Sequence, residues 1–167
     1  MKKLTKLFMV LAVSVLIAVA AVQIYAGQMD EKSEIAIRKI ESQVVLYTIY
    51  RGEYIKIGKS IGNLYGLAMK NQVWPKGSIS FVYLNNPQYI SAGHCLTEIR
   101  IPVGKKALEK AGTLGEMTDI KEIKAMEVAV IKKSLGQMNY SSLYISLFKW
   151  TSQNGYRMTE NASEIFT

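Results

Sequence analysis

Cysteine and histidine are almost absent from this sequence. Its 167 residues include one cysteine, Cys95, and one histidine, His94. A single cysteine excludes an intrachain disulfide and a cysteine-based metal cluster, and a single histidine excludes a multi-histidine metal site. We therefore expect no metal site, and we also predict no other cofactor. Because Cys95 begins a predicted strand, we expect its thiol to be buried and inert.

A phosphate-binding loop is also not predicted, although glycine is regularly spaced in one segment. Gly58, Gly62 and Gly66 recur every four residues inside a predicted helix, whereas a phosphate loop opens a helix after a strand. We interpret these glycines as a sign that the helix packs closely on a sheet.

Positive charge is in excess but is not clustered. The chain has 21 basic and 13 acidic residues and a formal net charge of +8. Lysines scattered along a sequence usually form a solvated surface, so we expect no nucleic-acid partner. An anionic membrane surface is a more natural neighbour for this surplus.

The first 26 residues have the parts of a targeting segment. Residues 1–6 are basic, and residues 7–26 are apolar with few interruptions, close to the roughly 20 residues that span a bilayer. The segment is either a signal peptide with an imperfect cleavage site near Ala26 or an uncleaved membrane anchor. An anchor would place the remaining chain on the outer side, and cleavage would leave it secreted or periplasmic. Residues 27–42 are interpreted as a linker, and residues 43–167 as one domain.

Strand and helix patterns alternate twice in that domain. The first half predicts a strand at 44–50, a helix face formed by residues 57, 61, 64 and 68, and strands at 78–84 and 95–103. The second half predicts a strand at 120–131, a helix from about 140 to 150 that Gly155 ends, and short strands at 156–158 and 163–166. Each half therefore reads as strand, helix, strand, strand.

Several segments of both halves resemble a known family. The first half carries YRGEYIKIGKSIGNLYG, GSISFVYLNNP and EIRIPVG, and the second carries MEVAVIKKSLGQMNYSSLYISLFKWTSQNGYRM and SEIFT. In this order they resemble the GyrI-like (gyrase-inhibitor-like) family, also known as the effector-binding domain of some bacterial transcription activators. The resemblance implies an α+β fold in which duplicated strand-helix-strand-strand units form a curved antiparallel sheet with two helices. In this chain an N-terminal hydrophobic helix would precede the domain.

The resemblance also implies a function. Members of the family bind small amphipathic or cationic molecules between aromatic walls, with an acidic residue that recognises positive charge. Some members are thought to hydrolyse small electrophiles instead. This chain departs from the pattern of the transcription activators because it has an export-type leader and no recognisable DNA-binding helices.

Glu98 is the candidate acidic residue. It lies in an otherwise apolar strand, and in the resemblance it matches the acidic position before Ile-Pro-Val. A carboxylate facing a partly desolvated cavity would attract a cation, or would serve as a general acid or base if its pKa were raised. The alternative is a salt bridge with Arg100, which lies two residues on and on the same face of the strand. His94 shares that face but lies roughly 13 Å from Glu98, so we expect it to cap the strand.

Aromatic residues supply the candidate pocket walls. Phe81 and Tyr83 share one face of a strand in the first half, and Trp150 and Tyr156 come from the second half. Flat aromatic side chains bind planar or cationic ligands by stacking and cation–π contacts. Tyr140 and Phe148 are instead expected in the core, and Tyr144 fits either place, because a helix also needs aromatic residues to pack on a sheet.

Three functions follow from this sequence. The first is an exported or membrane-tethered domain that binds small molecules through Glu98 and the aromatic walls. The second is a hydrolase of small electrophiles on the same scaffold, with Glu98 as its catalytic group. The third is a tethered protein-interaction module whose pocket is filled by its own side chains.

Overall fold

The protein has an α+β fold built from antiparallel sheets and few helices. The structure, a computed structural model, describes residues 35–86, 89–133, 140–159 and 161–166, with the backbone alone at residue 140. The predicted leader and its hydrophobic helix lie outside these residues. Within the described ranges, no helix is long and apolar enough to cross a membrane.

The elements follow one another in an order close to the predicted one. They are β1 (Ile35–Ile40), β2 (Gln43–Arg51), the 3-10 turn η1 (Tyr54–Lys56), α2 (Gly58–Lys70), β3 (Ser80–Tyr83), the 3-10 turn η2 (Ala92–His94), β4 (Leu96–Val103), the 3-10 segment η3 (Lys105–Lys110), β5 (Thr118–Ile123), β6 (Met126–Ile131), α3 (Tyr140–Gln153) and β7 (Ser163–Ile165).

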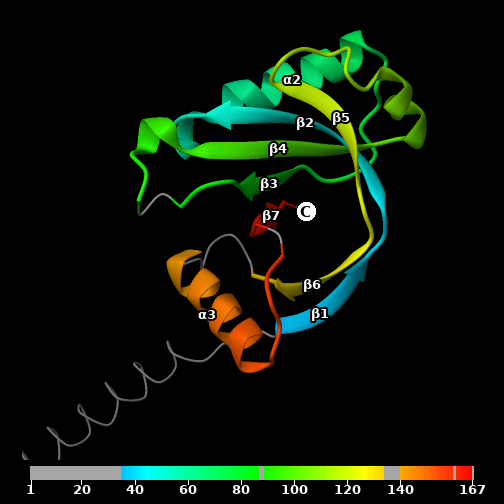
Figure 1. Ribbon diagram of the computed structural model, residues 1–167. Coiled ribbons are helices and arrows are strands. Elements are labelled where there is room, and N and C mark those ends of the chain that lie inside the picture. Colours follow the sequence, from blue (N-terminus) through cyan, green and yellow to red (C-terminus); the bar gives the residue numbers. More distant parts are fainter. Residues whose placement is uncertain (1–34, 87–88, 134–139, 160, 167) are drawn as a thin grey trace, which may run out of the picture.

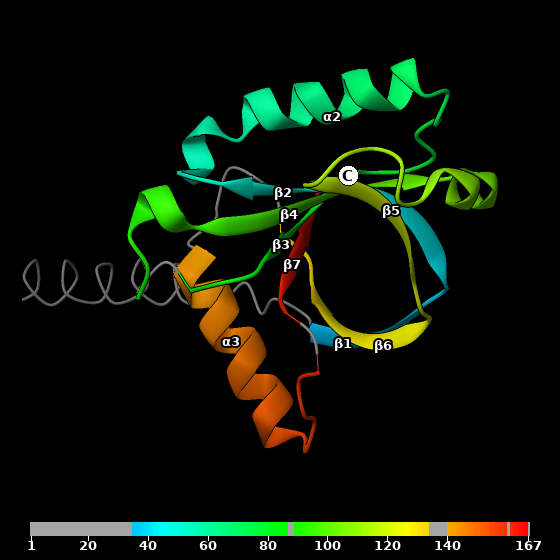
Figure 2. The ribbon, with the colours of Figure 1, turned by 45° about the horizontal axis from the view of Figure 1, so that its top comes forward.

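The strands form two antiparallel sheets. Five strands pair in the order β5-β2-β4-β3-β7, and β1 pairs with β6 in a separate two-stranded ribbon. Only two residues separate β1 from β2 and β5 from β6, so the ribbon continues the β2–β5 pair. Figures 1 and 2 show this continuation curving away from α2 and under the opposite face of the five-stranded sheet.

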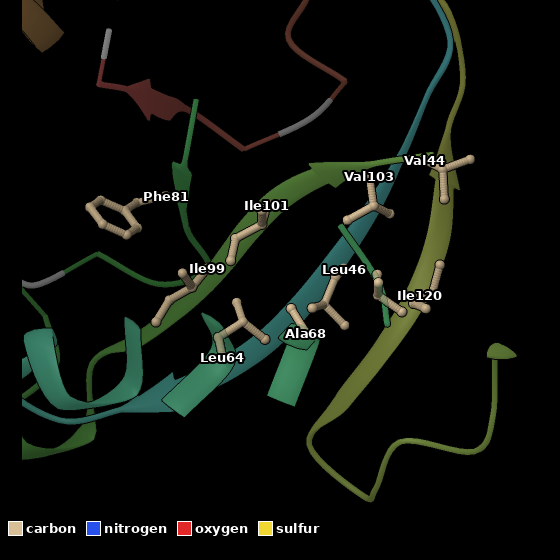
Figure 3. Packing of buried hydrophobic residues seen from close by; sticks show 10 residues of the cluster. Val44, Leu46, Leu64, Ala68, Phe81, Ile99, Ile101, Val103 and Ile120 are labelled. Carbon is tan, nitrogen blue, oxygen red and sulfur yellow. The ribbon is translucent and has the colours of Figure 1, made fainter. Parts of the chain in front are cut away.

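The core lies between α2 and one face of the five-stranded sheet. Leu64 and Ala68 of α2 pack on alternate residues of β2 and β4, among which Leu46, Ile99 and Ile101 have no exposed surface (Figure 3). Fully burying an aliphatic side chain of this size contributes about 1.5–3 kcal/mol. The alternating strand residues therefore fix which face of the sheet carries the core and which face does not.

The glycines of α2 do not pack on the sheet as we expected. A Cβ atom added at Gly58, Gly62 or Gly66 would meet no atom within 4 Å, and all three positions are exposed. The residues that contact the sheet lie on the other side of the helix, at Leu64 and Ala68. The described structure thus gives the glycines no packing role, and each costs helix stability relative to alanine.

Replacing Gly62 with alanine (Gly62→Ala) should therefore raise the free energy of unfolding by about 0.5–1 kcal/mol, because the new methyl group meets no neighbour and alanine favours the helix. Urea denaturation followed by circular dichroism would measure this. A fall in stability would contradict the exposed position and would mean that another surface covers this face of α2.

Three other segments differ from the sequence-based expectation. Residues 120–131, expected as one strand, form β5 and β6, which pair in different sheets. Residues 35–40, which we assigned to a linker, form β1. Its isoleucines do not alternate regularly with its charged residues, so the sequence shows no clear strand pattern there. Residues 156–158 form no strand, since the chain turns back at the end of α3, where Gly155 has a φ of +76° and Tyr156 N–H bonds to the Thr151 carbonyl. In the described residues the second half therefore reads strand, strand, helix, strand, and β7 pairs with β3 of the first half.

Candidate ligand-binding site

Glu98 is buried and already paired with two cations. Its side chain is 7% exposed, and its Oε1 atom accepts contacts from Arg100 Nε at 2.5 Å and from Lys121 Nζ at 2.7 Å. Arg100 follows on the same strand, whereas Lys121 reaches across β2 from β5. The structure thus contains the salt bridge between Glu98 and Arg100 that we gave as the alternative, and Lys121 adds a second cation.

The ion cluster occupies the sheet face opposite α2. Ile99 and Ile101 belong to the core beneath α2, so Glu98 and Arg100 face the other way. Tyr47 is directly across from Arg100 on β2, and Lys121 Nζ lies 4.3 Å from the centre of its ring. Burial, followed by the charges of Asp119 and Glu98, raises the pKa of Tyr47. This tyrosine therefore stays neutral and serves as a cation–π partner.

A second carboxylate, Glu164 of β7, has a very different environment. Tyr83 donates a hydrogen bond to its Oε2 atom and Tyr144 donates one to its Oε1 atom, both at 2.9 Å. Among the described residues, Glu164 forms no salt bridge. Two neutral hydroxyl groups hold this half-buried carboxylate in place without cancelling its charge.

Two tyrosines contact Glu164 and a third packs against one of them, and the three come from three different elements. Tyr83 lies on β3, Tyr144 on α3, and Tyr54 of η1 packs edge-on against Tyr83 with ring centres 5.1 Å apart. Burial and the nearby Glu164 charge raise the pKa of Tyr83. Burial, with the neighbouring Cys95 thiol and Glu164, raises the pKa of Tyr54 to about 12. Both hydroxyls therefore stay protonated at neutral pH.

Two hydroxyl groups, that of Tyr54 within the cluster and that of Thr97 beside it, have no oxygen or nitrogen partner among the described residues, although the Cys95 thiol neighbours the Tyr54 hydroxyl. Both hydroxyl oxygens are buried. Thr97 is directly across from Tyr83 in the register of β3 and β4. Buried polar groups are nearly always satisfied in proteins, so these hydroxyls are available to a polar group of a ligand or to a water molecule.

The structure distributes the predicted site residues over separate places. Tyr83 belongs to the tyrosine cluster, but Phe81 is a core residue, 9% exposed, with its ring 5.3 Å from that of Phe166. Trp150 and Tyr156 stack on each other across the end of α3, with ring centres 5.7 Å apart and nearly parallel planes. Glu98 lies with the ion cluster on the face opposite α2.

Sequence reasoning missed two residues of the cluster and misplaced one core residue. Glu164 stands in the quoted segment SEIFT and Tyr54 follows the break after β2, but neither was singled out as a site residue. Phe148, expected in the core, is 40% exposed. The expectations for two other residues agree with the structure, since Cys95 is buried and the exposed His94 lies in the turn before β4, with Ser91 Oγ 2.7 Å from its Nδ1.

Two further features do not form a site. Residues 58–62, Gly-Lys-Ser-Ile-Gly, have the spacing of a nucleophile elbow, but they lie within α2 after a 3-10 turn, whereas an elbow joins a strand directly to a helix. A hollow of about 130 Å³ is lined by Ala36, Arg38, Val130 and Lys132 of the β1–β6 ribbon. It is smaller than the usual ligand pockets of about 300–1,000 Å³.

Comparison with solved structures identifies the fold. The C-terminal domain of EcmrR superposes with a TM-score of 0.64 at 16% sequence identity, over 80% of this chain and 84% of that domain. The chain has the fold of that C-terminal domain. The EcmrR chain in the EcmrR–DNA complex of EcmrR-RPo superposes with a TM-score of 0.68 at 15% identity, over 98% of this chain and 60% of that chain. No family model and no curated protein matches the sequence.

These matches agree with the α+β fold implied by the GyrI-like resemblance, and at this identity they identify the fold alone. They also correct one expectation. We expected no nucleic-acid partner, yet a chain that contains this fold was solved in a complex with DNA. The scattered lysines were therefore an insufficient reason to exclude nucleic acid, because in such a chain the fold can be one part of a larger DNA-bound assembly.

Proposed function

We propose that this protein binds a small amphipathic or cationic molecule at the tyrosine cluster around Glu164. One observation carries the proposal: the Glu164 carboxylate is held by two neutral hydroxyls, 2.9 Å away on either oxygen, with no cation paired to it among the described residues. The fold shared with the EcmrR C-terminal domain supports the proposal at the level of the scaffold.

The chemistry of this cluster suits a cation. The Glu164 carboxylate supplies a full negative charge, and the aromatic faces of Tyr54 and Tyr83 supply cation–π contacts that strengthen as water is excluded. The hydroxyl groups of Tyr54 and Thr97, which have no oxygen or nitrogen partner among the described residues, would bind a polar group of the same ligand. Glu98, the residue that we first expected in this role, is a weaker candidate because two cations already bind its Oε1 atom.

We also propose that residues 1–26 export this domain or anchor it to a membrane, with the domain on the outer side. The support is the basic start of the chain followed by the apolar residues 7–26.

A pair of probes of similar shape tests the binding proposal. Tetraphenylphosphonium, a lipophilic cation, should raise the melting temperature of the protein, whereas triphenylphosphine oxide, which is uncharged, should raise it much less, because only the cation gains from Glu164. Equal effects of the two compounds would contradict charge recognition. Consumption of a small electrophilic probe would favour the hydrolase function instead.

A further inference from the structure

The ion cluster opposite α2 carries more positive than negative charge. Arg100 and Lys121 share a single carboxylate oxygen, Glu98 Oε1, so two positive charges meet one negative charge. The next carboxylate in this part of the sheet, Asp119, accepts backbone hydrogen bonds from Gly112 at 2.6 Å and from Ile120 at 2.8 Å. Among the described residues Asp119 forms no salt bridge, and its charge acts on Tyr47 as that of Glu98 does.

The contact between Arg100 and Glu98 in the described structure leaves the two terminal nitrogens of the Arg100 guanidinium group free for a ligand. Its contact with Glu98 uses Nε alone, and its terminal nitrogens have no partner among the described residues. The two terminal nitrogens of a guanidinium group form a planar fork that matches both oxygens of a carboxylate or phosphate. The Arg100 side chain is 19% exposed and that of Lys121 is 35% exposed, so both cations are held by the protein and still reach solvent.

One aromatic, one polar and two aliphatic residues flank the ion cluster. Tyr47 and Ser80 flank Arg100 in the sheet register, and Ile49 and Val82 flank Glu98. The β1–β6 ribbon curves beneath this face of the sheet, so the cluster lies on the concave side of the molecule (Figures 1 and 2). Charge-assisted bonds are stronger at such partly desolvated positions than in open water.

We propose that Arg100 and Lys121, positioned by Glu98, form a binding site for the carboxylate or phosphate group of a small molecule. Glu98 then acts as a positioning residue that holds two cations together. This assignment is opposite in sign to the cation site at Glu164 and does not depend on it.

Titration of the full-length chain with benzoate and with inorganic phosphate at millimolar concentrations tests the proposal, with benzamide as the uncharged counterpart of benzoate. We expect at least one of the two anions to bind and benzamide not to bind. Arg100→Lys keeps the charge but removes the fork, and Lys121→Met keeps the packing but removes the charge. Each variant should weaken binding of that anion at least about tenfold, which corresponds to about 1.4 kcal/mol.

Lys59→Gln is the matched control. Lys59 is an exposed cation on α2, on the other side of the sheet, and its loss should leave anion binding unchanged. Circular dichroism of each variant without ligand checks that it is folded. If Lys121→Met does not fold, Arg100→Lys alone tests the proposal. No binding of either anion, equal binding of benzamide, or an equal loss of affinity in Lys59→Gln would each overturn the proposal.

Discussion

Glu164→Gln is expected to weaken the binding of tetraphenylphosphonium by roughly tenfold to a hundredfold. The substitution keeps the shape of the side chain and one oxygen for the tyrosine hydroxyls, but it removes the negative charge that no cation neutralises in the described structure. Hydrogen bonds and contacts to a charged group contribute about 1.5–3 kcal/mol when water is partly excluded, which corresponds to this range of affinity. Isothermal titration calorimetry would measure the change.

The matched control for this experiment is Glu109→Gln. Glu109 is an exposed acid in η3 that makes none of the contacts of the tyrosine cluster, so this variant removes the same formal charge from a different place. Affinity should remain that of the wild type. If both variants weaken binding equally, the cation responds to the overall charge of the protein, and Glu164 is not its specific partner.

Glu98→Gln is expected to lower the free energy of unfolding by about 1–3 kcal/mol. Removing one member of a buried ion pair typically costs about 3–5 kcal/mol, but here the two remaining cations are partly exposed, which reduces the cost. Without the carboxylate, Arg100 and Lys121 lie close together with no negative charge between them. Urea denaturation of the variant beside the wild type would measure the difference.

A double substitution checks that this loss comes from the ion cluster. Glu98→Gln combined with Lys121→Met should cost less than the sum of the two single substitutions, because removing one cation relieves the repulsion that the first change creates. Additive losses would mean that Glu98 and Lys121 do not interact in solution. Unchanged stability in Glu98→Gln alone would contradict the burial of this carboxylate.

Local patterns in the sequence predicted most of the first half of the fold. The apolar run 44–50 lies within β2, and residues 95–103 correspond closely to β4, because buried strands are rich in β-branched residues that recur on alternate positions. The same alternation placed Glu98 and Arg100 on one face of β4. The pairing between them was therefore open to prediction from the sequence.

The remaining contacts depend on segments that are distant in the sequence. Lys121 reaches Glu98 only because β2 brings β5 close to β4, and no local pattern encodes that order of strands. Glu164 lies on a strand of three residues whose partner, β3, is about 80 residues earlier in the chain. A strand this short gives no reliable periodic signal, so the sequence pattern points to the acidic residue of the longer strand β4 instead.

Because β7 is short, its pairing with the sheet would depend on whether a ligand occupies the site. β7 lies at the edge of the sheet and is held there by three register positions on β3, by the Phe81–Phe166 ring contact and by the two tyrosine hydrogen bonds to Glu164. Such an edge opens at a lower free energy than the central strands do. A ligand that binds only when β7 is paired with β3 would increase the fraction of molecules in which they are paired. Ligand binding would therefore make this edge of the sheet more ordered.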